Sequence, residues 1–191
     1  SVEALQKRDK KSSEEIIRND LSINKKRFDI EEKCLSLIAT QQPMAVDLRT
    51  LAAILSIITD LERIGDHAEG NAKITILMGD EPLIKPLVDI PRMADIGLSM
   101  LDRSLKAFVK RDAETARLIC NDDDMVDALH DQIYRELLVL MMENTKVILM
   151  ATYLTWISHN LERIADRATN IAERVVFMVT GKMEELNVSK Y

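Results

Sequence analysis

The sequence is poor in residues that interrupt helices or favour strands. Its 191 residues include only five Gly and four Pro, and aromatic side chains make up 4%. Strand-rich folds are therefore disfavoured, whereas the abundant Ala, Leu, Ile, Met, Glu, Lys and Arg favour helices. A chain of this length buries a sizeable core. We predict an all-α protein.

Other features that the sequence lacks exclude several classes of function. The net charge is -6 and no Lys/Arg stripe occurs, so we expect no nucleic-acid partner and favour cations as ligands. The longest uncharged run, Val147–Leu161, has fifteen residues and is shorter than the roughly 18–20 apolar residues of a membrane span. No short apolar segment follows a basic start, so we expect no signal peptide. Since no P-loop, G-x-S-x-G or Cys/His nucleophile pattern is found, we expect no enzyme.

Cysteine is scarce as well. Cys34 and Cys120 are the two present, far apart and each within a helical apolar pattern. This pattern indicates buried, reduced thiols in a cytosolic protein. A disulfide between them stays open as an alternative at this point.

What the chain does contain is an internal repeat. "LERIGDHA" at Leu61–Ala68 returns 100 residues later as "LERIADRA" at Leu161–Ala168, and "KRD" at residues 7–9 returns at residues 110–112. Between the halves lies the helix-breaking stretch "GDEPLIKPLVDIP". We therefore predict a first repeat at 1–78, a linker at 79–91 and a second repeat at 92–191.

Each half is predicted to contain a helical hairpin, with turns at "TQQPM", residues 40–44, and "ENTK", residues 143–146. In the second half a further helix, about Pro91–Val109, precedes the hairpin, and Asp112 suits the next N-cap. By symmetry, Ser1–Gln6 is the end of a truncated first helix, and we expect roughly a dozen or more of its residues before Ser1. The predicted architecture is a tandem pair of three-helix bundles.

The last helix of each half carries an apolar stripe with two acids on its shoulder. Glu62 and Asp66 in the first half, and Glu162 and Asp166 in the second, are spaced four residues apart. Like charges at this spacing repel, and neither Glu62 nor Asp66 has a Lys or Arg four residues away. The stripe of the first copy consists of Leu51, Ile54, Leu55, Ile58, Leu61, Gly65, Ala68 and Ala72.

The preceding helix also places polar residues on its apolar side. In the first half these are Asp20, Asn24 and Glu31, and in the second half Asp123 and Asp127 with His130 nearby. We predict that two helices of each bundle aim carboxylates toward one another. The apolar residues expected to surround the first set, and hence to form the core, are Ile16, Ile17, Ile23, Phe28, Cys34, Leu35 and Ile38.

Buried carboxylates without a partner cost several kcal/mol each unless positive charge compensates them. An oxygen-rich site suits Mg, Ca, Mn or iron, whereas two scattered Cys cannot form a thiolate zinc site. The competing interpretation is a metal-free helical scaffold in which Arg63, Arg163, Arg27 or His130 neutralise the acids. His67 and His159 fall away from the acid faces, so we expect a surface or packing role for them.

A di-metal carboxylate oxidase is disfavoured because such sites place His three residues after Glu. Here Gly65 follows Glu62 and Ala165 follows Glu162 at that spacing.

The stretch "ATQQPMAVDLRTLAAILSIITDLERIGDHAEGNA", together with "NLERIADRATNIAERV", resembles the PhoU family of phosphate-uptake regulators. The similarity covers nearly the whole chain. It implies two similar three-helix bundles and, in some members, multinuclear iron or zinc clusters held by Glu or Asp followed four residues later by Asp. The motif falls on Glu62/Asp66, Glu162/Asp166 and Asp123/Asp127, whereas Asp20 is followed by Asn24, so the first site is expected to be weaker or to use Glu31.

The resemblance also implies partners and a location. It suggests a cytoplasmic, peripherally membrane-associated protein that restrains the phosphate-starvation response. The expected contacts are the ATPase subunit of the high-affinity phosphate transporter and a sensor histidine kinase. Related regulators accompany other phosphate transporters, so the transporter is open, as is homodimerisation.

Overall fold

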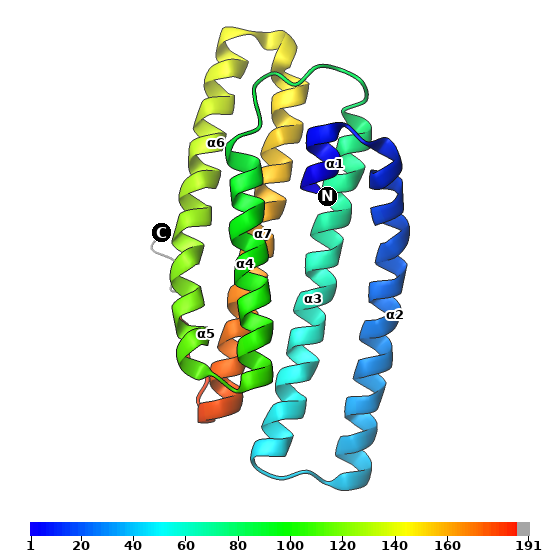
Figure 1. Ribbon diagram of the computed structural model, residues 1–191, viewed down its shortest axis with the longest axis vertical. Coiled ribbons are helices and arrows are strands. Elements are labelled where there is room, and N and C mark those ends of the chain that lie inside the picture. Colours follow the sequence, from blue (N-terminus) through cyan, green and yellow to red (C-terminus); the bar gives the residue numbers. More distant parts are fainter. Residues whose placement is uncertain (187–191) are drawn as a thin grey trace.

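The computed structural model describes residues 1–186 and confirms the all-α prediction (Figure 1). No strand occurs among these residues. Two one-turn 3-10 helices adjoin the α-helices, at Cys120–Asp122 and Thr145–Val147. The α-helices are α1 (Val2–Lys7), α2 (Lys10–Gln41), α3 (Val46–Leu77), α4 (Asp89–Lys110), α5 (Ala113–Ile119), α6 (Asp123–Glu143) and α7 (Ile148–Thr180).

The predicted repeat extends to the geometry of the helix ends. α1 and α4 both end at an arginine in the left-handed conformation, Arg8 at φ 55° and Arg111 at φ 56°. The aspartate that follows then caps the next helix. Asp9 accepts a hydrogen bond from the Ser12 amide and Asp112 from the Thr115 amide, both at 3.0 Å. These are N-caps that satisfy otherwise unpaired amides, and the Asp112 prediction is confirmed.

α3 and α7 run antiparallel side by side at the centre of the molecule (Figure 1). Ala53 and Ile57 on α3 pack with Ile171 and Met178 on α7 in one small buried cluster. The remaining helices flank this pair, with α2 beside α3 and with α4, α5 and α6 beside α7. The two halves therefore meet through their equivalent last helices.

The core is denser in the second half because α4 covers the face of α6 and α7. Ile133 of α6 is only 2% exposed, whereas its repeat counterpart Ile30 on α2 is 38% exposed. α1 has six residues where α4 has 22. α1 therefore covers only the start of the first hairpin.

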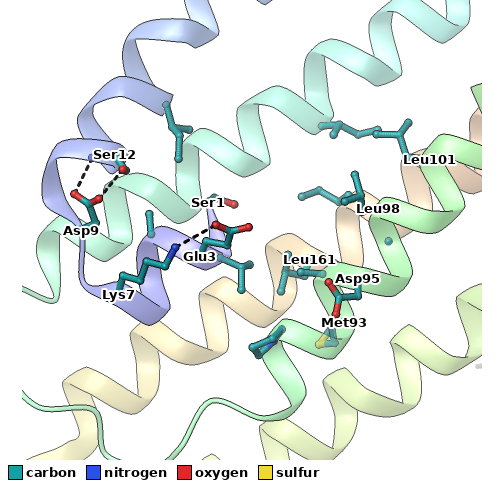
Figure 2. Close-up of a pocket in the computed structure, with 18 residues that line it drawn as sticks. Ser1, Glu3, Lys7, Asp9, Ser12, Met93, Asp95, Leu98, Leu101 and Leu161 are labelled. Atoms are coloured by element: carbon teal, nitrogen blue, oxygen red, sulfur yellow. Dashed lines mark hydrogen bonds and ion pairs between the residues drawn. The ribbon is translucent and has the colours of Figure 1, made fainter.

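A groove of about 480 Å³ continues the line of α1 between α3, α4 and α7 (Figure 2). Its walls include Leu98, Leu101 and Leu161, with Glu3 and Asp95 near its rim. In the second half, α4 has 22 residues where α1 has six. We therefore interpret the groove as a packing space of the first bundle and not as a ligand site.

One core prediction for α2 is wrong. Cys34 is buried and Ile16, Ile17 and Ile38 are partly buried. Phe28 and Leu35, which were expected in the core, are exposed, as is Ile23 to a smaller degree. The reason is that, within residues 1–186, α3 is the only helix that packs along most of α2, so one face of α2 is buried and the others meet solvent.

Among the described residues, no helix combines the length and apolar character that crossing a membrane requires. Cys34 and Cys120 are both buried free thiols, as predicted. Burial raises the pKa of the Cys120 thiol to about 12, with Glu173 and Asp123 adding to the effect. The thiol is therefore un-ionised and unreactive at neutral pH.

Candidate metal centre

The four acids predicted for the second half lie on the facing helices α6 and α7. Asp123 is buried, and Asp127, Glu162 and Asp166 are partly buried. Burial, then Asp166, raises the pKa of Glu162 to about 7, and Asp127 and Asp123 contribute further. Burial and Asp166 also raise the pKa of Asp127. The pKa shifts of these carboxyl groups show that the two helices bring their charges together.

Two basic groups meet this acid set. Arg163 Nη1 lies 2.5 Å from Asp166 Oδ2, and this guanidinium opposes the rise in pKa that burial causes at Asp166. His159 Nδ1 lies 3.2 Å from Glu162 Oε2, an ion-pair distance without hydrogen-bond geometry. The prediction that His159 lies away from the acids is therefore wrong. His159 precedes Glu162 by three residues, a spacing that puts both on one helix face.

The imidazole of His130 lies next to that of His159. The rings of His130 and His159 are 5.9 Å apart, and His130 Nδ1 lies 3.1 Å from the Ser158 hydroxyl oxygen. Burial, then His159, lowers the pKa of His130. His130 is therefore neutral at pH 7, and a neutral imidazole has a ring nitrogen that can coordinate a metal ion.

The first half holds a smaller set. Asp20 is only 8% exposed, and its Oδ2 accepts a hydrogen bond from Asn24 Nδ2 at 2.9 Å. Its Oδ1 is buried without a hydrogen-bond partner. Burial, then Asp66 and Glu69, raises the pKa of Asp20. Asp20 thus lies against α3 beside Gly65, where the charges of Asp66 and Glu69 act on its carboxyl group.

Gly65 makes this approach possible. A Cβ atom at this position would lie 3.2 Å from Asp20 Oδ1 and 3.1 Å from the Ile23 side chain. The absence of a side chain therefore lets α2 come close to α3. Ala165 stands at the equivalent place in α7, so the second half does not require so close an approach.

The other predicted first-half residues lie less centrally. Glu62 is partly buried on α3, and Asp66 is exposed at the rim. Glu31 is 3.9 Å from Arg27, a distance too long for more than a loose ion pair. The Arg27 guanidinium instead lies 4.4 Å above the Phe28 ring. Arg27 is the repeat counterpart of His130, so the first half carries a fixed cation where the second half has an imidazole.

Within residues 1–186, no three His, Cys, Asp or Glu side chains lie close enough together to hold a metal ion. Glu162 and Asp166 instead lie beside His159 and Arg163, respectively. The donor types still suit a cation, because Asp, Glu and His are the ligands of Mn, iron and zinc. The buried, unpaired Asp20 Oδ1 fits the same conclusion in the first half.

A polar joint that the sequence patterns did not reveal lies between α3 and α7. Asp60 accepts from Arg167 Nη1 at 3.4 Å and from Asn170 Nδ2 at 3.5 Å. On the other side of the crossing, Asn160 lies 3.3 Å from His67 Nδ1 and donates to Asn71 at 2.9 Å. Since Asp60 and Asn160 are repeat counterparts, the joint follows the pseudo-twofold relation between the halves. His67 thus has a packing role.

Known proteins match both the sequence and the fold. The PhoU domain model matches residues 1–75 and 90–175. A phosphate-specific transport system accessory protein PhoU homolog of Clostridium acetobutylicum is 39% identical over 97% of this chain and 85% of its own length. The corresponding homolog of Aquifex aeolicus is 38% identical, over 96% and 83%.

Two crystal structures are similar throughout. PhoU from Streptococcus pneumoniae has a TM-score of 0.90 at 34% identity, covering 96% of this chain and 86% of that one. PhoU from Pseudomonas aeruginosa has a TM-score of 0.91 at 33% identity, covering 95% and 87%. The two domain matches, these relatives and the tandem helical bundles all agree. The chain belongs to the PhoU family.

Proposed function

We propose that this protein is a metal-binding regulatory adaptor of phosphate uptake. It restrains the high-affinity phosphate transporter and the phosphate-starvation two-component response by contacting the transporter ATPase subunit and a sensor histidine kinase at the cytoplasmic face of the membrane. Its relatives are named accessory proteins of a phosphate-specific transport system, which supports this role. Long, fixed helical faces suit docking onto partner proteins.

The metal part of the proposal depends on one observation, the crowding of carboxyl groups between α6 and α7. Glu162 has a pKa of about 7 because burial and its acidic neighbours disfavour the charged form. A divalent or trivalent cation would supply the missing positive charge and pin the two helices together. Iron or zinc clusters suit Asp123, Asp127, Glu162 and Asp166, and Mg, Ca or Mn are further candidates.

The first half is proposed as a weaker site, formed by Asp20, Asn24, Glu62 and Asp66. Asn24 contributes an amide in place of the carboxylate at Asp127. Arg27 brings a permanent positive charge to the same side of α2. Both differences reduce the electrostatic attraction for a cation.

A metal analysis of protein purified from its native source tests the metal proposal. The double variant Glu162→Ala with Asp166→Ala should lose bound iron or zinc while its circular dichroism stays helical. Asp102→Ala with Glu114→Ala is a matched control, because both acids lie at the surface in ion pairs with Lys106 and Arg117. Equal metal content in both variants would reject metal binding at α6 and α7.

The 2.5 Å contact between Arg163 and Asp166 favours a second candidate, a metal-free scaffold with the same partners. A titration of the purified ATPase subunit against the chelated protein separates the two. The metal-binding adaptor should bind the subunit more weakly after chelation, whereas the scaffold should bind it equally well. The regulatory role is tested by deleting the gene in its host, which should switch on phosphate-starvation genes in phosphate-rich medium.

A further inference from the structure

The segment that follows α7, residues 181–186, folds back onto the second bundle. α7 ends at Gly181, whose left-handed conformation at φ 78° lets the chain reverse direction after the helix. The Leu186 amide then donates a hydrogen bond of 2.8 Å to Glu173 Oε1, at a position about two helical turns before the end of α7. This segment, which we call the tail, therefore runs back along α7.

Polar and apolar contacts hold the tail in place. Glu184 Oε2 accepts a hydrogen bond of 2.9 Å from Arg117 Nη2 on α5, whereas Leu186 is held by Glu173 on α7. The Leu186 side chain is partly buried against the main hydrophobic cluster. Since α5 and α7 pack side by side, the tail lies over the seam between them. We call this surface the α5–α7 seam; it has a base on one side and an acid on the other.

The internal repeat shows that the two charged anchors are not needed to build a bundle. The counterpart of Arg117 on α2 is Glu14, and the counterpart of Glu173 on α3 is Lys73. Lys73 pairs with Glu69 on its own helix at 2.6 Å. The first half thus has the opposite charge at both positions and still forms its hairpin. We infer that Arg117 and Glu173 serve to bind a segment and not to pack the helices.

The tail fills its place incompletely. Cavities of about 360 and 190 Å³ adjoin it, and both are bordered by Glu173 and Glu185. Well-packed protein interiors contain few voids of this size. The side chains of Arg117 and Glu184 remain 32% and 34% exposed, and ion pairs open to solvent contribute little to stability. A segment that fills these cavities would therefore displace the tail.

The contacts of the tail specify what the seam binds. Arg117 recognises a carboxylate, Glu173 accepts a backbone amide, and the place of Leu186 takes an aliphatic side chain. The tail presents these groups in the sequence "KMEEL", residues 182–186. Main-chain hydrogen bonds combined with places for particular side chains are a common way to bind extended peptides. Charge complementarity with Arg117 thus favours an acidic segment that carries a leucine.

We propose that the α5–α7 seam is a docking site for an acidic, leucine-containing segment of a partner protein, and that the tail occupies this site until the partner displaces it. Because the tail is tethered, it has a high effective concentration although its contacts are weak. The proposal rests on the adaptor role given above, for which it names a surface and the chemistry of the segment that fits it. It does not depend on metal binding.

Trypsin cleavage after Lys182 measures how often the tail is released. The double variant Glu184→Ser with Leu186→Ser should be cut at this bond at least about fivefold faster than the wild type, because cleavage follows the population of the open form. Glu114→Ser is the matched control, since Glu114 also pairs with Arg117, at 3.0 Å, but lies on α5. It should be cut at the wild-type rate. Equal rates in all three proteins would overturn the proposal.

Peptide binding tests the docking site on the full chain. A synthetic KMEEL peptide, titrated into isotope-labelled protein and followed by NMR, should shift the amide signals of α5 and the end of α7 in the double variant. It should bind the wild type at least about tenfold more weakly, because the tail competes for the seam. Adding Arg117→Ala to the double variant should abolish the shifts, and a KMKKL peptide should not cause them.

Circular dichroism checks that each variant stays helical. A double variant that does not bind KMEEL, or that binds KMKKL equally well, would overturn the docking site. The same holds if the wild type binds KMEEL as tightly as the double variant does, because the tail would then not occupy the site. The titration uses neither a metal nor a transporter subunit, so these failures are distinct from a failure of the proposed function.

Discussion

The two halves of the chain share a repeat but differ in how completely they bury it. In the second half, α4 covers α6, and the buried positions form a dense core. In the first half, six-residue α1 covers the beginning of α2, and equivalent positions remain partly exposed. Within the described residues, equivalent positions are therefore buried to different extents, and the stabilisation they contribute depends on the area that neighbours remove from water.

The largest difference in stability between the halves is expected when Ile133 and its repeat counterpart Ile30 are each replaced. Ile133→Ala should lower the free energy of unfolding by about 2–5 kcal/mol, because it leaves a cavity under α4. Ile30→Ala should lower it by no more than about 1 kcal/mol, since its side chain already meets solvent. Urea unfolding of both variants measures the two changes. Equal losses would show that the first half is packed as tightly as the second.

The α3–α7 joint offers a second comparison. Asp60→Ala removes the partner of the mostly buried Arg167 and should lower the free energy of unfolding by about 2–3 kcal/mol. Asn160→Ala, at the pseudo-twofold counterpart, removes neutral hydrogen bonds and should cost about 1–2 kcal/mol. Thermal unfolding of the two variants tests the order. A greater loss in Asn160→Ala would mean that the ion pair contributes less than the amide contacts.

The third prediction concerns pH. The pKa of Glu162 is raised from 4.5 to about 7, so the folded protein holds a proton that the unfolded chain releases. In the absence of metal, the contribution of Glu162 to the free energy of unfolding should therefore be greatest below about pH 4.5. It should fall as the pH rises to about 7. Glu162→Gln should remove a fall of at most about 3 kcal/mol.

Urea midpoints between these pH values, measured with chelator present, check this expectation. Glu62→Gln is the matched variant in the first half. If Glu162→Gln and the wild type lose stability in parallel as pH rises, another group is responsible.

The smallest difference is expected at the helix caps. Asp9→Ala and Asp112→Ala each remove one N-cap, and the two caps have the same geometry. Hydrogen bonds from Ser12 and Thr115 lower the pKa of Asp9 and Asp112, respectively. Both variants should lower the unfolding temperature slightly and by similar amounts. A clear difference between them would show that the ends of α2 and α5 are held by different contacts.

Much of the fold could be predicted because it depends on short-range patterns. The turn at Pro43, the cap at Asp112 and the repeated "LERI" helices are each determined by residues within one or two helical turns. The acid pairs could also be found, because a spacing of four residues places side chains on one helix face. The position of His159 beside Glu162 could be found in the same way, because a spacing of three residues also places two side chains on one helix face.

The all-helical class, the tandem repeat, the caps and the family can be deduced from the order of the residues alone. The exposure of Phe28 and Leu35, the contact of Asp60 with Arg167 and the contact of Arg163 with Asp166 depend on how the helices are arranged in space. The physical reason is that a helical pattern fixes directions around one axis, whereas burial and pairing depend on which other helices surround that axis.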